Sequence, residues 1–171
     1  MLIRFESPND FAAIHALTTR AFAPMAFSDG SEPQIIDQLR SDGDLTLSLV
    51  AEENGEVIGH LALSPMTISG VTNWLGLGPI SVAPNRQRQG IGSALVGRAV
   101  QHCKDNGISG IALIGNPAVY APMGFKSNGK LTYQNLPTGY VQFLTIAGPD
   151  PEGELKFAPA FDDDQGQTER L

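Results

Sequence analysis

Residues 84–99 read PNRQRQGIGSALVGRA, and this stretch decides how the rest of the chain is interpreted. Gly90 and Gly92 stand one residue apart, directly before a run whose apolar residues recur at helical spacing. A helix that begins here offers unpaired backbone amides and a partial positive charge, which together favour an anion such as a phosphate. Glycine lets the anion approach the backbone closely. We therefore predict an anion site at the start of this helix.

Three other interpretations of the two glycines are weaker. A Walker A loop needs a lysine after its last glycine, but Ser93 follows Gly92. A dinucleotide-binding fingerprint needs a third small residue where this chain has Leu95. Close packing explains the apolar ridge of the helix, but not the donor-rich run at residues 86–89 in a chain that is acidic overall. The ridge consists of Ile91, Leu95, Ala99 and Cys103.

Length and composition predict a single domain. The chain has 171 residues, of which 42% are hydrophobic, enough for one sizeable core. We expect this domain to cover residues 1–160, followed by an acidic, flexible tail at residues 161–171.

The net charge and the cysteine and histidine content limit which kinds of partner and which cellular compartment we expect for this protein. The net charge of −7 disfavours nucleic acid and anionic membranes as partners. No signal peptide or membrane-spanning run is present in the sequence, and Cys103 has no second cysteine to pair with. The three histidines lack metal-ligand spacing. We therefore expect a cytoplasmic protein with no metal, no nucleic-acid partner and no membrane partner.

Local patterns predict an α/β or α+β fold whose sheet is largely antiparallel in its first half. The hairpin at residues 45–68 is the clearest element, because its Asn54-Gly55 pair favours a two-residue turn. Asn116 followed by Pro117 is typical of a helix start. We expect further strands at residues 2–6, 73–83 and 108–115, more strands within 130–148 and 153–159 with turns at 137–139 and 149–153, and helices at 9–22, 31–40 and 85–107.

Two motifs in order give a specific family resemblance. Residues 82–92 read VAPNRQRQGIG, which resembles the acetyl-coenzyme A signature Q/R-x-x-G-x-G/A of the GNAT N-acetyltransferases, with Gln87, Gly90 and Gly92 at its defined positions. About thirty residues later, YAPMGF at residues 120–125 is similar to the Y-x-x-x-G-F of the same family. The resemblance covers roughly residues 1–147. The segments GPISV and GNPAVY are most similar to the YhbS-like branch.

The resemblance implies a fold and a cofactor. The fold is a mixed, mostly antiparallel sheet with splayed central strands flanked by helices. The co-substrate is acetyl-CoA, whose pantetheine arm pairs with the main chain of the strand at 74–82 and whose pyrophosphate rests on the helix start, with Arg86 and Arg88 supplying charge. The cofactor-binding residues that it implies are Ile80, Ser81, Val82, Gln87, Arg88, Gln89, Gly90, Ile91, Gly92, Ser93 and Asn116.

The resemblance also implies direct acetyl transfer to a primary amine of a small molecule or to an exposed amino group, for example of a peptide. Tyr120 occupies the position of the general acid, and a phenol stays protonated at neutral pH. The base stays open between Asp29, Glu32, His60 and water, because the strand at 74–82 holds no Asp or Glu. This lack leaves a non-catalytic acyl-CoA-binding module as the alternative. A homodimer through an edge strand near residues 153–159 is a further possibility.

Overall fold

A computed structural model of the chain describes residues 1–162. Residues 163–171, most of the expected acidic tail, lie outside the described part. The elements occur in the order β1 (Leu2–Phe5), α1 (Phe11–Phe22), α2 (Glu32–Asp42), β2 (Leu47–Glu53), β3 (Glu56–Ile68), β4 (Val71–Val82), α3 (Ile91–Asp105), β5 (Gly110–Ile114), α4 (Pro117–Tyr120), β6 (Leu131–Thr132), β7 (Val141–Thr145) and β8 (Gly153–Lys156).

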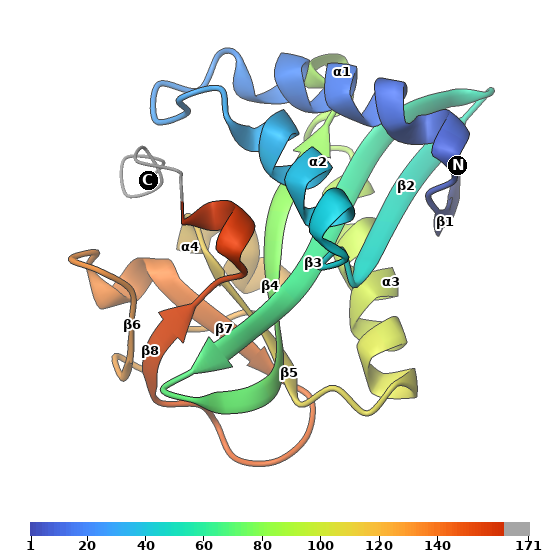
Figure 1. Cartoon of the computed structure of the whole chain (residues 1–171). Helices are drawn as coiled ribbons and strands as arrows, with labels where there is room; N and C mark the ends of the chain where they lie inside the picture. Colours follow the sequence, from blue (N-terminus) through green and yellow to red (C-terminus); the bar gives the residue numbers. More distant parts are fainter. Residues whose placement is uncertain (163–171) are drawn as a thin grey trace.

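One sheet organises the molecule, with α1 and α2 packed on one of its faces and α3 on the other (Figure 1). The strands follow the order β1-β2-β3-β4-β5-β7, and β4–β5 is the parallel neighbour pair on this path. The mixed, mostly antiparallel sheet expected from the sequence is therefore confirmed. Within residues 1–162, no helix is both long enough and apolar enough to span a membrane.

The turn between β2 and β3 has the geometry that its sequence requires. Asn54 and Gly55 both have positive φ angles, 53° and 79°, as a type I′ turn demands. Glu53 pairs with Glu56 across the turn, so two residues connect the strands. This hairpin places β2 and β3 side by side under the helices.

The central strands β4 and β5 separate after a short paired segment. They pair at Trp74 with Gly110, Leu75 with Ile111, and Gly76 with Ala112. Past that point β4 stays paired with β3 as far as Val82. The edge of β4 that faces β5 is therefore left open over its second half, as the resemblance implies.

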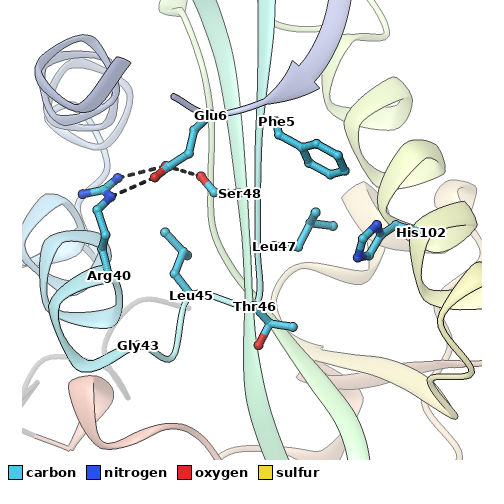
Figure 2. A pocket seen from close by; sticks show the side chains of 9 residues that line it. All are labelled: Phe5, Glu6, Arg40, Gly43, Leu45, Thr46, Leu47, Ser48 and His102. Carbon is cyan, nitrogen blue, oxygen red and sulfur yellow. Dashed lines mark hydrogen bonds and ion pairs between the residues drawn. The ribbon is translucent and has the colours of Figure 1, made fainter. Parts of the chain in front are cut away.

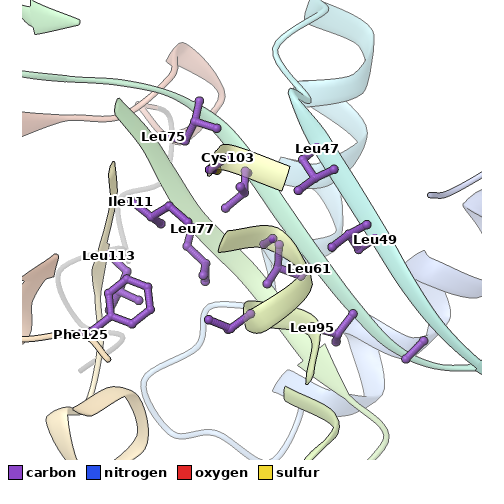
Figure 3. Close-up of a cluster of buried hydrophobic side chains, with 14 of the residues drawn as sticks. Leu47, Leu49, Leu61, Leu75, Leu77, Leu95, Cys103, Ile111, Leu113 and Phe125 are labelled. Atoms are coloured by element: carbon purple, nitrogen blue, oxygen red, sulfur yellow. The ribbon is translucent and has the colours of Figure 1, made fainter. Parts of the chain in front are cut away.

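The main hydrophobic core lies between the sheet and α3 (Figure 3). Leu61 and Leu63 of β3 belong to it. The predicted ridge of α3 is confirmed, because all four of its residues are buried in this core: Ile91, Leu95, Ala99 and Cys103.

Two local expectations differ from the structure. Helix α3 begins at Ile91 instead of residue 85, because Arg88 and Gly90 take left-handed conformations, with φ of 62° and 86°, that interrupt a helix. Strand β8 pairs with both β3 and β6, so the dimer edge expected near residues 153–159 is already occupied within the chain.

Candidate functional site

The connection from β4 to α3 forms an open cradle of main-chain amides. It passes through a short 3-10 helix, Pro84–Arg86, and reaches Gly90, the N-cap of α3, with φ of 86°. A Cβ placed on Gly90 would meet no atom within 4 Å, so the space beside this backbone is open. The first amides of a helix have no partner within the helix. The cradle therefore suits an anion that approaches the main chain closely.

The charged residues of this loop differ in their availability. The Arg86 guanidinium forms an ion pair with Glu53, and its Nε also donates to Gln89 Oε1 at 3.1 Å. Arg86 is therefore already neutralised, contrary to the expectation that it supplies charge to a ligand. Arg88 is exposed and forms no ion pair with any residue in the range 1–162. It remains the cation of this loop.

Other predicted residues fasten the loop or contribute only their backbone. Gln87 Nε2 donates to the carbonyl of Val82 at 3.2 Å and ties the loop to the end of β4. The side chain of Ile91 is buried in the core, so only its amide faces the cradle. Ser93 is exposed in the first turn of α3.

The structure brings the two sequence motifs together. A Cβ on Gly92 would lie 3.9 Å from Val82 Cγ2 and 3.8 Å from Met123 Cε. Met123 belongs to the turn that follows α4. The start of α3, the end of β4 and the YAPMGF segment therefore meet at one place.

Tyr120 is held at the end of α4 by local geometry. Asn116 caps this helix as predicted, since its Oδ1 accepts a hydrogen bond from the amide of Ala118 at 2.9 Å. The ring of Tyr120 stacks edge-on against Phe125, with centroids 6.1 Å apart. Burial raises the pKa of the Tyr120 phenol to about 12. The phenol is therefore protonated throughout the neutral range.

The open half of β4 presents different side chains to the two faces of the sheet. Ile80 and Val82 pack against the core on the α3 face, as does Tyr120. Ser81 is buried on the other face, beneath α1, where its Oγ donates to Thr18 Oγ1 at 3.4 Å.

The three candidate bases occupy different surroundings. Asp29 is exposed and accepts a hydrogen bond from the amide of Ser31 at 2.9 Å, as a turn residue does. Glu32 is 1% exposed at the start of α2 and accepts from Ser28 Oγ at 2.6 Å. His60 is fully buried in β3, and burial lowers the pKa of its imidazole to about 4.

Sequence reasoning missed one polar group entirely. Glu6 accepts hydrogen bonds from Arg40, which lies 34 residues away in sequence, and from Ser48. No motif links such distant positions, because the hydrogen bonds arise only when β1, α2 and β2 converge.

Comparison with known proteins agrees with this geometry. The model of the acetyltransferase (GNAT) family matches residues 11–125. The uncharacterized N-acetyltransferase YhbS of Escherichia coli is 36% identical over 128 residues, which cover 74% of each chain. A GNAT family acetyltransferase from Brucella melitensis, solved in complex with acetyl-CoA, is 41% identical with a TM-score of 0.84, covering 94% of this chain and 97% of that one. E. coli YhbS in complex with CoA is 29% identical in the structural alignment with a TM-score of 0.86, covering 95% and 92%. The chain therefore belongs to the GNAT family of acetyltransferases.

Proposed function

We propose that this protein binds acetyl-CoA in the opening between β4 and β5 and transfers the acetyl group to a primary amine. The observation that carries the proposal is the open amide cradle at Gly90 and Gly92, which lies beside the turn that holds Tyr120. The two relatives solved with acetyl-CoA and with CoA share the fold over nearly the whole chain, which supports this ligand.

The pyrophosphate is assigned to the start of α3. Its oxygens would accept hydrogen bonds from the amides of residues 88–93, and the partial positive charge of the helix terminus would add to this attraction. Arg88 supplies the side-chain charge, because Arg86 is paired with Glu53. The open space at Gly90 leaves room for the phosphate oxygens.

The pantetheine arm is assigned to the free edge of β4. Strand pairing with β5 ends at Gly76, so the main chain at residues 80–82 can bond an extended ligand as it would bond another strand. The side-chain oxygen of Asn116 is engaged by the amide of Ala118. Asn116 would therefore meet the arm with its Nδ2 donor.

Tyr120 is assigned the role of general acid. Acetyl transfer requires a proton for the departing thiolate, and the phenol of Tyr120 is a donor on the face of β4 where Ile80 and Val82 pack. Because the pKa of Tyr120 is about 12, its deprotonation would cause no loss of activity below about pH 10. If activity falls with rising pH below about pH 10, a group other than Tyr120 must be losing the proton.

The alternative is a module of the same fold that binds an acyl-CoA without catalysis, since β4 contains no carboxylate. The test is the release of free CoA thiol from acetyl-CoA on addition of aliphatic, aromatic and peptide amines. An enzyme releases thiol with at least one amine, and Tyr120→Phe then lowers kcat about a hundredfold with an unchanged Kd for acetyl-CoA. A module binds acetyl-CoA equally well but releases no thiol. Equal turnover by Tyr120→Phe and the wild type would remove the acid role.

A further inference from the structure

Four side chains from four segments form a continuous hydrogen-bonded chain, Arg40–Glu6–Ser48–His60, in which Ser48 and His60 are buried and Arg40 and Glu6 are half-buried. Arg40 donates to both carboxylate oxygens of Glu6, from Nε and Nη2, each at 2.9 Å. Ser48 Oγ lies in hydrogen-bond contact with Glu6 Oε1 and at 2.7 Å from His60 Nε2. Figure 2 shows Glu6 between Arg40 and Ser48 at one side of a cavity of about 280 Å³.

The protonation states along this chain follow from its chemistry. Burial opposes ionisation of Glu6, but hydrogen bonds from Arg40 and Ser48 lower the pKa of its carboxyl below the ordinary value. An ionised carboxylate only accepts hydrogen bonds, so Ser48 must give it the single hydroxyl proton. The bond between Ser48 Oγ and His60 Nε2 is then donated by the imidazole. His60 therefore carries its proton on Nε2.

This tautomer leaves a lone pair on His60 Nδ1. That atom is buried and has no hydrogen-bond partner among residues 1–162. A buried acceptor without a donor loses its solvation and gains no hydrogen bond in return, so such an atom in a native protein calls for a donor that arrives from elsewhere. Burial keeps the pKa of His60 at about 4, so the imidazole is neutral and the lone pair present at physiological pH.

The register of the sheet indicates where such a donor comes from. His60 pairs directly with Ser81 of β4, so the two side chains are neighbours on the α1 face of the sheet. Ser81 is also the only residue with a polar side chain in the separated half of β4, residues 77–82. Its present bond to Thr18 Oγ1 is long, at 3.4 Å, and is therefore easily exchanged.

We propose that Ser81, His60, Ser48 and Glu6 form a relay that removes the proton of the acceptor's ammonium group during acetyl transfer. This inference rests on the proposed function and supplies the base that β4 lacks. The ammonium N–H bond breaks and its proton passes to Ser81 Oγ, while the Ser81 hydroxyl proton bonds to His60 Nδ1. The Nε2 proton moves to Ser48 Oγ, and the Ser48 proton moves to Glu6, which releases it to solvent at the cavity that it lines. His60 then holds its proton on Nδ1 and returns to the Nε2 tautomer before the next cycle.

The charged groups around His60 let it pass a proton on but do not favour an imidazole that keeps a second proton. Glu6 and Asp10 favour a positive charge on His60, whereas burial and Arg40 oppose it. Because burial keeps the pKa of His60 at about 4, the imidazole is neutral before and after each proton transfer. Tyr120 and Ser81 lie on opposite faces of β4, so the acid and the relay do not exchange protons with each other.

The experiment compares kcat/KM across pH for the wild type, Ser81→Ala, Ser48→Ala and His60→Gln, using acetyl-CoA and the amine that the wild type acetylates fastest. Glutamine keeps a donor for Ser48 but has no basic lone pair. Each variant should lose about tenfold or more at pH 7, and the loss should shrink towards pH 10 as free amine accumulates in solution. The matched control is Ser64→Ala, which removes another buried hydroxyl of β3 and should leave the profile unchanged.

A loss of equal size at every pH would indicate a structural role and overturn the relay, as would an unchanged Ser81→Ala profile. If His60→Gln does not fold, two other experiments test the relay. The first is the pH profile of Ser81→Ala, and the second is long-range ¹⁵N–¹H NMR of the wild-type protein with labelled histidine. The spectrum should show a neutral His60 protonated on Nε2, and protonation on Nδ1 would contradict the relay. Wild-type protein that releases no thiol with any amine would overturn the proposed function itself.

Discussion

The ring of Tyr120 occupies the space that a side chain on Gly115 would need. A Cβ on Gly115 would lie 2.5 Å from Tyr120 Cε2 and 2.9 Å from Cδ2. Glycine at the end of β5 is therefore what allows the ring to pack against the strand. The absence of a side chain at Gly115 therefore sets the orientation of the Tyr120 ring, the proposed general acid.

Replacing Gly115 with alanine should displace Tyr120 without touching the coenzyme cradle. We expect Gly115→Ala to lower kcat about tenfold or more while the Kd for acetyl-CoA is unchanged, as measured by steady-state kinetics and calorimetry. Gly139→Ala is the control, because a Cβ at Gly139 meets nothing within 4 Å. Full activity of Gly115→Ala would show that the position of the ring is unimportant.

A bulky residue at Gly92 should block the pyrophosphate and leave the fold intact. A Cβ at Gly92 makes only ordinary contacts, and Gly97, on the same helix, has open space around it. We expect Gly92→Leu to weaken acetyl-CoA binding by about tenfold or more, with no loss of thermal stability. Gly97→Leu should bind normally and be stabilised by up to about 1 kcal/mol, because leucine has the higher helix propensity. Parallel losses of affinity in both variants would argue against the cradle.

His60 should make stability depend on pH between about 4 and 6.5. The pKa of His60 is about 4 in the folded protein, against about 6.5 when unfolded, so the unfolded chain binds the extra proton in this window. The contribution is fully present above pH 6.5 and is lost as the pH falls to 4, in total about 3 kcal/mol. Urea unfolding of the wild type should show this slope, and His60→Gln should remove it. An identical slope in both proteins would mean that other groups cause it.

Cys103 should be inert in the native protein. Its thiol lies on the buried face of α3, and burial raises its pKa to about 11. We expect a disulfide reagent at pH 8 to label it only after denaturation. Rapid labelling of native protein would show that this helix opens readily. The expected inertness also means that free CoA is the thiol detected in the release assay.

Much of the fold was predictable because its signals are local. The turn at Asn54-Gly55, the cap at Asn116 and the ridge of α3 each depend on a few neighbouring residues, and all three are confirmed. The start of α3 was placed too early, because the left-handed conformation of Arg88 carries no compositional signal.

The long-range features were not predictable from the sequence. Strand β8 pairs with β3 and β6, and Arg86 is neutralised by Glu53 at the end of β2. Both depend on segments that meet only in the folded chain. The order of the two motifs was nevertheless enough to predict that the helix start and Tyr120 share one site.

The central claim is that the amides at the start of α3 bind a diphosphate. Calorimetric titration of the wild-type protein with acetyl-CoA, and with S-acetylpantetheine, which lacks the diphosphate, tests it most directly. We predict saturable binding of acetyl-CoA, at least about tenfold tighter than that of S-acetylpantetheine. Equal affinities, or no uptake of acetyl-CoA at about millimolar concentration, would contradict the account.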